Sequence, residues 1–134
     1  LWNVREEFDG ALPAYLYDVS LPIRNMETYV ARLGERLQAW REDARCEVFG
    51  HIADGNLHIF VKPYADGAHH ETSDGIVYGC LDGLEGSISA EHGIGIDKRP
   101  WLGLSRSADE LKLMRELKRL LDPQNLLNPG KVLN

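Results

Sequence analysis

The chain has 134 residues, with 15 Lys and Arg against 21 Asp and Glu, which gives a formal net charge of −6. This length corresponds to one domain, and a hydrophobic content of 43% supplies a core, which excludes a disordered chain. The acidic balance argues against nucleic acid as a partner, because phosphate binding needs clustered Lys and Arg. No transmembrane segment is expected, since the longest apolar run, residues 14–17, is far shorter than the roughly 20 residues that cross a bilayer.

The chain begins with Leu1 rather than Met, in a stretch that already looks structured, so we expect it to be part of a larger protein. Residues 1–11 are expected to be helical. Cys46 and Cys80 lack the close spacing of a metal knuckle or a redox pair, which favours buried free thiols in a reducing compartment over a disulfide. We therefore expect a cytoplasmic protein, or one at the periphery of the inner membrane.

The first half of the chain predicts a strand, a helix and a hairpin, in that order. Residues 15–20 form the strand. After Pro22, apolar residues recur at alternating steps of four and three, which predicts an amphipathic helix of about 17 residues covering a sheet. These residues are Met26, Val30, Leu33, Leu37 and Trp40.

Two β-rich runs, 46–52 and 57–62, are separated by Asp54-Gly55, a dipeptide typical of a two-residue type I′ turn. With that turn, residues whose numbers sum to 109 face each other, and apolar, charged and aromatic residues all find matching partners. His51 then lies directly opposite His58, with Cβ atoms roughly 4.5 to 5.5 Å apart.

The second half predicts a helix over 71–84, ended by Gly86 in a left-handed conformation, and a short strand at 87–90. A final helix begins at Ser107, whose side chain forms a capping box with Glu110, and ends at Asp122, before an extended, turn-like tail. The order of elements predicts an α+β fold, with helices packed on one face of an antiparallel sheet.

The histidines of the hairpin suggest a metal site. Two adjacent imidazoles can bind one divalent ion, and Glu91, followed by a histidine and a glycine, is the best candidate for a third ligand. Its neighbour His92 would then be free as a general base. The alternative is that His51 and His58 stack half-exposed and bind nothing, with His92 a simple loop histidine. Spacing alone leaves both interpretations open.

Three blocks, taken in order, carry a family resemblance: residues 50–58, 87–95 and 122–131. They resemble the C-terminal domain of FAD-linked oxidases of the vanillyl-alcohol-oxidase superfamily, in the branch of D-lactate, D-2-hydroxyglutarate and glycolate dehydrogenases. Residues 17–22 and 98–102 also look like landmarks of this family, so the resemblance covers nearly the whole chain. It implies that residues 1–134 are one ferredoxin-like α+β cap domain, which closes over an FAD held by a separate N-terminal domain.

The resemblance also implies roles for individual residues. The metal ligands, for a zinc-like divalent ion, would be His51, His58 and Glu91. His92 would take the hydroxyl proton of a small 2-hydroxy acid while hydride passes to the flavin. The remaining implied contacts are with substrate, through Arg5 and Asn56, and with the flavin, through the tail residues Asn128 and Lys131.

One departure from the family bears on the substrate. Leu16 stands where 2-hydroxyglutarate-type enzymes tend to carry a Lys, which favours a smaller or more apolar 2-hydroxy acid such as lactate or glycolate. Two other functions stay open, a metal-dependent hydrolase with His92 activating water, and a non-catalytic ligand-binding or subunit-contact module. The electron acceptor is not identified by the sequence, and a homodimer is a family-level expectation.

Overall fold

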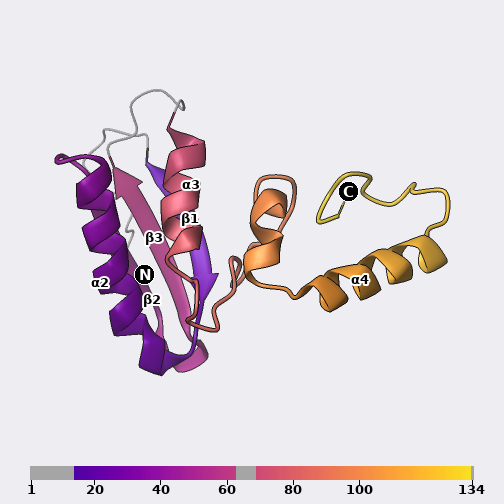
Figure 1. Ribbon diagram of the computed structural model, residues 1–134, viewed down its shortest axis with the longest axis horizontal. Helices are drawn as coiled ribbons and strands as arrows, with labels where there is room; N and C mark the ends of the chain where they lie inside the picture. Colours follow the sequence, from indigo (N-terminus) through magenta and orange to yellow (C-terminus); the bar gives the residue numbers. More distant parts are fainter. Residues whose placement is uncertain (1–13, 63–68, 134) are drawn as a thin grey trace, which may run out of the picture.

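The computed structural model describes residues 14–62 and 69–133, arranged as helices, strands and two short 3-10 turns (Figure 1). The predicted helix at 1–11 and the candidate substrate residue Arg5 lie outside the described residues. The elements, in chain order, are β1 (Tyr15–Ser20), α2 (Ile23–Trp40), β2 (Arg45–His51), η1 (Ile52–Asp54), β3 (Asn56–Lys62), α3 (His70–Gly79), η2 (Arg99–Leu104) and α4 (Ala108–Leu121).

The sheet has three strands in the order β1-β3-β2, and each neighbouring pair is antiparallel. Helices α2 and α3 lie side by side on one face of the sheet (Figure 1). Beyond β1, an isolated antiparallel bridge joins Ser20 to Ser87 through backbone hydrogen bonds of 3.1 and 2.7 Å. This is the position of the fourth strand in a ferredoxin-like order, so the predicted α+β fold is confirmed, with the strand at 87–90 reduced to one bridge.

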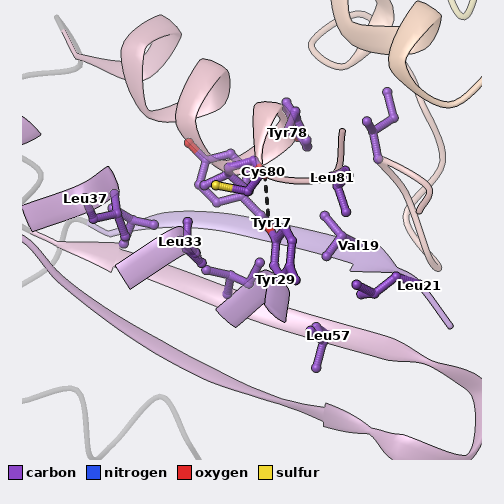
Figure 2. Close-up of a cluster of buried hydrophobic side chains, with 14 of the residues drawn as sticks. Tyr17, Val19, Leu21, Tyr29, Leu33, Leu37, Leu57, Tyr78, Cys80 and Leu81 are labelled. Carbon is purple, nitrogen blue, oxygen red and sulfur yellow. Dashed lines mark hydrogen bonds between the residues drawn. The ribbon is translucent and has the colours of Figure 1, made fainter. Parts of the chain in front are cut away.

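The core lies between the sheet and the two helices (Figure 2). Alternate residues of β1 point into it, and β3 contributes in the same way, as expected for a sheet with one covered face. In α2 the buried residues are Tyr29, Leu33 and Leu37. Val30, predicted on the buried stripe, is 36% exposed instead, because Tyr29 fills that side of the helix and its hydroxyl donates to the carbonyl of Val77 at 3.1 Å.

The predicted hairpin register is wrong by two residues. The numbers of paired residues sum to 107, so Phe49 faces His58 and His51 faces Asn56. Because the error is an even number, every side chain keeps its predicted face of the sheet. His51 and His58 are therefore diagonal neighbours rather than direct partners, with ring centroids 5.9 Å apart.

The turn itself explains the difference in register. It comprises the 3-10 turn η1 followed by Gly55 in a left-handed conformation with φ +74°, rather than two residues. The N–H of Leu21, just after β1, donates to the carbonyl of Gly55 at 3.0 Å. A Cβ at position 55 would lie 2.4 Å from the Leu21 carbonyl oxygen. This long-range contact with the end of β1 selects the longer turn over the local type I′ preference.

Two helix ends test the remaining local predictions. The capping box at the start of α4 is confirmed, with the Ser107 side chain accepting from the Glu110 N–H at 3.2 Å. The predicted helix over 71–84 is α3, which ends at Gly79, and the left-handed residues that follow are Gly83 and Glu85 rather than Gly86. Gly86 is needed for space instead, because a Cβ there would lie 2.7 Å from Leu81 Cδ2.

The thiols and the helices bear on two further predictions. Cys46 and Cys80 are both free, as predicted; the predicted burial is confirmed for Cys80, whereas Cys46 is only half-buried. Within the described part of the chain, no helix combines the length and apolar character that a membrane crossing requires.

Leu33 and Val30 on α2 provide a direct test of which helix face is buried. We expect Leu33→Ala to lower the free energy of unfolding by about 2–5 kcal/mol, because it opens a cavity beneath the sheet. Val30→Ala should change it by no more than about 0.5 kcal/mol. Urea denaturation of the two variants checks this, and equal losses would contradict the observed orientation of the helix.

Candidate functional site

Aromatic side chains form a row on the sheet face that α2 and α3 leave open. Phe60 stacks on Phe49, with ring centroids 5.4 Å apart, and Phe49 contacts His58 at the same centroid distance. His58 in turn contacts His51 at 5.9 Å and His92 at 6.1 Å. The row therefore runs from an apolar end to a histidine end, where three imidazoles from two separate parts of the chain meet.

Glu91 lies between the two histidines of the hairpin. Its Oε1 atom is 3.7 Å from His51 Nδ1 and 3.7 Å from His58 Nε2. The same oxygen accepts a hydrogen bond from the side-chain amide of Asn56. Asn56 is buried, and its own Oδ1 atom has no hydrogen-bond partner among the described residues. A single carboxylate oxygen thus gathers both predicted histidine ligands and the predicted substrate residue.

The donor chemistry of His51, His58 and Glu91 suits a zinc-like ion, since two imidazoles and a carboxylate are a common ligand set. In their present arrangement one oxygen of Glu91 lies 3.7 Å from a nitrogen of each imidazole and accepts from the Asn56 amide. Among residues 14–62 and 69–133, no group of three His, Cys, Asp or Glu side chains is positioned to hold a metal ion. The three predicted ligands thus lie near one another, and Asn56 would have to release Glu91 for them to close around a metal.

Asp18 determines the path of the segment that carries Glu91 and His92. It is fully buried, and its Oδ2 atom accepts hydrogen bonds from the backbone N–H groups of Ala90, Glu91 and His92 at 2.9, 2.7 and 3.0 Å. Its other oxygen accepts from the ammonium group of Lys98. The segment therefore folds back over β1, which brings the Glu91 side chain to the hairpin histidines.

The ionisation of Asp18 follows from these contacts. Burial alone would raise the pKa of its carboxyl group, but the His92 N–H and the Lys98 ammonium favour the charged form more strongly. Together with the Glu91 N–H they lower the pKa to about 2. Asp18 is therefore a carboxylate throughout the neutral range. Its Oδ1 atom lies 3.4 Å from His92 Nδ1, and the His92 side chain is 62% exposed.

Sequence reasoning did not identify Asp18 as part of the site. The available signal was a charged residue in the middle of an otherwise apolar strand, Tyr15–Ser20. A charge in such a position needs compensating partners, which here come from residues more than 70 positions further along the chain. No local pattern connects the two segments.

The predicted flavin contacts Asn128 and Lys131 lie apart from the histidine cluster. Both line a pocket of about 220 Å³ between α4 and the tail, together with basic side chains, namely Arg115, Lys118 and Arg119. The tail is tied to the segment after His92, because the Val132 N–H donates to the Gly95 carbonyl at 2.8 Å. The structure thus connects the tail to the loop that carries His92 through backbone hydrogen bonding.

The chain is similar in sequence to a known protein family and to several curated proteins. Residues 1–132 match the family model of the FAD linked oxidases, C-terminal domain. A protein named D-2-hydroxyglutarate dehydrogenase from Xanthomonas citri pv. viticola is 43% identical over 98% of this chain and 30% of its own length. A mitochondrial protein of that name from Bos taurus is 41% identical over 99% of this chain and 25% of its own length. The chain thus spans less than a third of the length of these curated relatives.

Proposed function

Because the chain belongs to the FAD-linked oxidases as their C-terminal domain, we propose that it is the substrate-binding cap of an FAD-dependent dehydrogenase that oxidises a D-2-hydroxy acid to the 2-oxo acid. The main supporting observation is that Glu91 and His92 meet the hairpin histidines and Asn56 at one end of the open sheet face. The flavin domain and the electron acceptor lie elsewhere in the whole protein or its partners. The 134 residues alone should therefore not turn over substrate.

In this proposal His92 is the base of the reaction. Oxidation of a 2-hydroxy acid removes a hydride from C2 and a proton from the hydroxyl group, and the C2–O single bond becomes a carbonyl. The hydride and its electron pair go to FAD when it is bound. His92 accepts the proton through its exposed ring. Arg5 would bind the substrate carboxylate and Asn56 would contact the substrate, as the family resemblance implies; the Oδ1 atom of Asn56 is a buried acceptor without a partner among the described residues.

Asn128 and Lys131 would contact the flavin. Their pocket carries Arg115 and Arg119, which suit an anionic group such as a phosphate, whereas its Lys118 is paired with Asp122. A divalent metal belongs to the same proposal, with His51, His58 and Glu91 as its ligands. Such an ion would act as a Lewis acid on the substrate oxygens. The cytoplasmic location and the homodimer remain predictions.

His92 provides the first test, in the full-length flavoprotein. We expect His92→Asn to slow anaerobic reduction of the flavin by D-2-hydroxy acids by ~10²–10⁴-fold, because the proton acceptor is lost. The control is His69→Asn, since His69 contacts Trp40 and lies outside the cluster. Both variants should retain flavin. Normal flavin reduction in His92→Asn, or hydrolase activity of the 134-residue chain without flavin, would contradict the proposal.

Metal analysis of the full-length protein tests the ligand set. After dialysis against a weak chelator, we expect near-stoichiometric divalent metal in the wild type and its loss in both His51→Ala and Glu91→Ala. His70→Ala is the matched control, because His70 is a half-exposed histidine that pairs with Asp74 instead. A metal-free wild type, or metal that persists in both variants, would show that these three residues are not metal ligands.

Leu16 provides the test of substrate choice. It is 56% exposed, on the same sheet face as His58, and pairs across the strands with Phe60, so this end of the site is apolar. We expect the full-length enzyme to prefer D-lactate or glycolate to D-2-hydroxyglutarate, the compound in its relatives' names. Leu16→Lys should raise kcat/KM for D-2-hydroxyglutarate by ~10-fold or more through a charge-assisted contact, whereas Leu16→Met should not. A wild-type preference for D-2-hydroxyglutarate would overturn this choice.

A further inference from the structure

We propose that Asp18 is a positioning residue for His92, holding its imidazole with the proton on Nδ1 so that Nε2 is the atom that accepts the substrate proton. This inference rests on the proposed role of His92 as the base. It adds a residue on β1 that does not touch substrate and acts through the histidine.

The first part of the argument is the backbone around His92. One oxygen of Asp18 accepts three consecutive N–H groups, from Ala90, Glu91 and His92, at 2.7 to 3.0 Å. Hydrogen bonds to a buried carboxylate are charge-assisted and stronger than those between neutral groups. Because Asp18 lies on β1 directly opposite His58 of β3, these bonds fix the backbone of His92 relative to the hairpin histidines.

The second part concerns the ring. The other Asp18 oxygen, Oδ1, lies 3.4 Å from His92 Nδ1 and also binds the ammonium group of Lys98. A carboxylate can only accept a hydrogen bond, so it favours the tautomer with hydrogen on Nδ1. Nε2 of the neutral ring is then unprotonated.

If Asp18 only held the segment after Ser87 against β1, its contact with the His92 ring would not be needed. The backbone contacts on Oδ2 alone would hold the segment, and the ammonium of Lys98 would balance the charge. Placing Oδ1 between Lys98 and the His92 ring adds a contact that affects only the orientation and tautomer of the imidazole. Oδ2 thus holds the backbone of the segment, while Oδ1 binds Lys98 and also faces the His92 ring.

The experiment uses the full-length flavoprotein with isotope-labelled histidine. Nitrogen NMR at a pH where the ring is neutral reports the tautomer, and the His92 signals are assigned by their absence in His92→Asn. We expect hydrogen on Nδ1 in the wild type and a shift toward Nε2 in Asp18→Asn, whose amide can donate to Nδ1. In Asp18→Asn, kcat for flavin reduction should fall by ~10²-fold or more, as for a base held in the wrong tautomer, while KM changes by less than about threefold.

Ser89→Ala is the matched control. Its hydroxyl lies 3.4 Å from Asp18 Oδ2 and 3.1 Å from Lys98 Nζ and donates to the Gly93 carbonyl at 3.0 Å, and it forms no hydrogen bond with the His92 ring among the described residues. We expect this variant to keep kcat and KM within about threefold of the wild type. A loss equal to that of Asp18→Asn would show that any disturbance of the buried pair has the same effect, which would overturn the positioning role.

The outcomes distinguish this inference from the proposed function. Hydrogen on Nε2 of wild-type His92, or an unchanged kcat in a folded Asp18→Asn, overturns the positioning role while leaving His92 as the base. If no D-2-hydroxy acid reduces the flavin of the wild type, the proposed function fails, and the tautomer measurement still decides the Asp18–His92 contact. Should Asp18→Asn not fold, the wild-type tautomer alone confirms or overturns it.

Discussion

The buried carboxylate of Asp18 is the constraint on which the site depends. A charge in the interior of a domain is costly unless hydrogen bonds and an opposite charge compensate it, and here three backbone N–H groups and Lys98 do so. Satisfying Asp18 forces the segment 89–92 to turn back over β1. Glu91 reaches the hairpin histidines only because of that turn, so the cluster on the open face follows from one residue of β1.

In the hairpin, a two-residue difference in register changes which side chains face each other, although the same residues stay on each face of the sheet. In the predicted register His51 faces His58, and Asn56 faces Ala53 beside the turn. In the structure His51 faces Asn56, whose amide lies 3.5 Å from His58 Nε2 and donates to Glu91. The contact of Gly55 with Leu21 therefore determines which polar group shares the carboxylate. A local turn preference could not include this, because Leu21 is distant in sequence.

Local signals were sufficient where the structure depends on neighbours in sequence. The capping box at Ser107 and the periodicity of α2 placed two helices correctly, and the strand Tyr15–Ser20 was also predicted with its observed bounds. The candidate cluster could be assembled from the hairpin faces and the family resemblance. Burial of Tyr29 in place of Val30, the end of α3 at Gly79 and the role of Asp18 all depend on contacts between distant segments. These are the features that periodicity and turn chemistry do not contain.

The ion pair of Asp18 and Lys98 also indicates that this part of the molecule serves to fix the loop that carries His92. An apolar pair of similar volume would stabilise a core as well or better, because burying two charges costs nearly as much as their attraction returns. Apolar side chains, however, could not accept hydrogen bonds from Ala90, Glu91 and His92, and the backbone there would be left to water or to another conformation. The hydrogen bonds to the Asp18 carboxylate therefore define a path of the loop that apolar side chains could not. A fixed backbone matters most for a side chain like His92, whose ring is largely exposed to solvent.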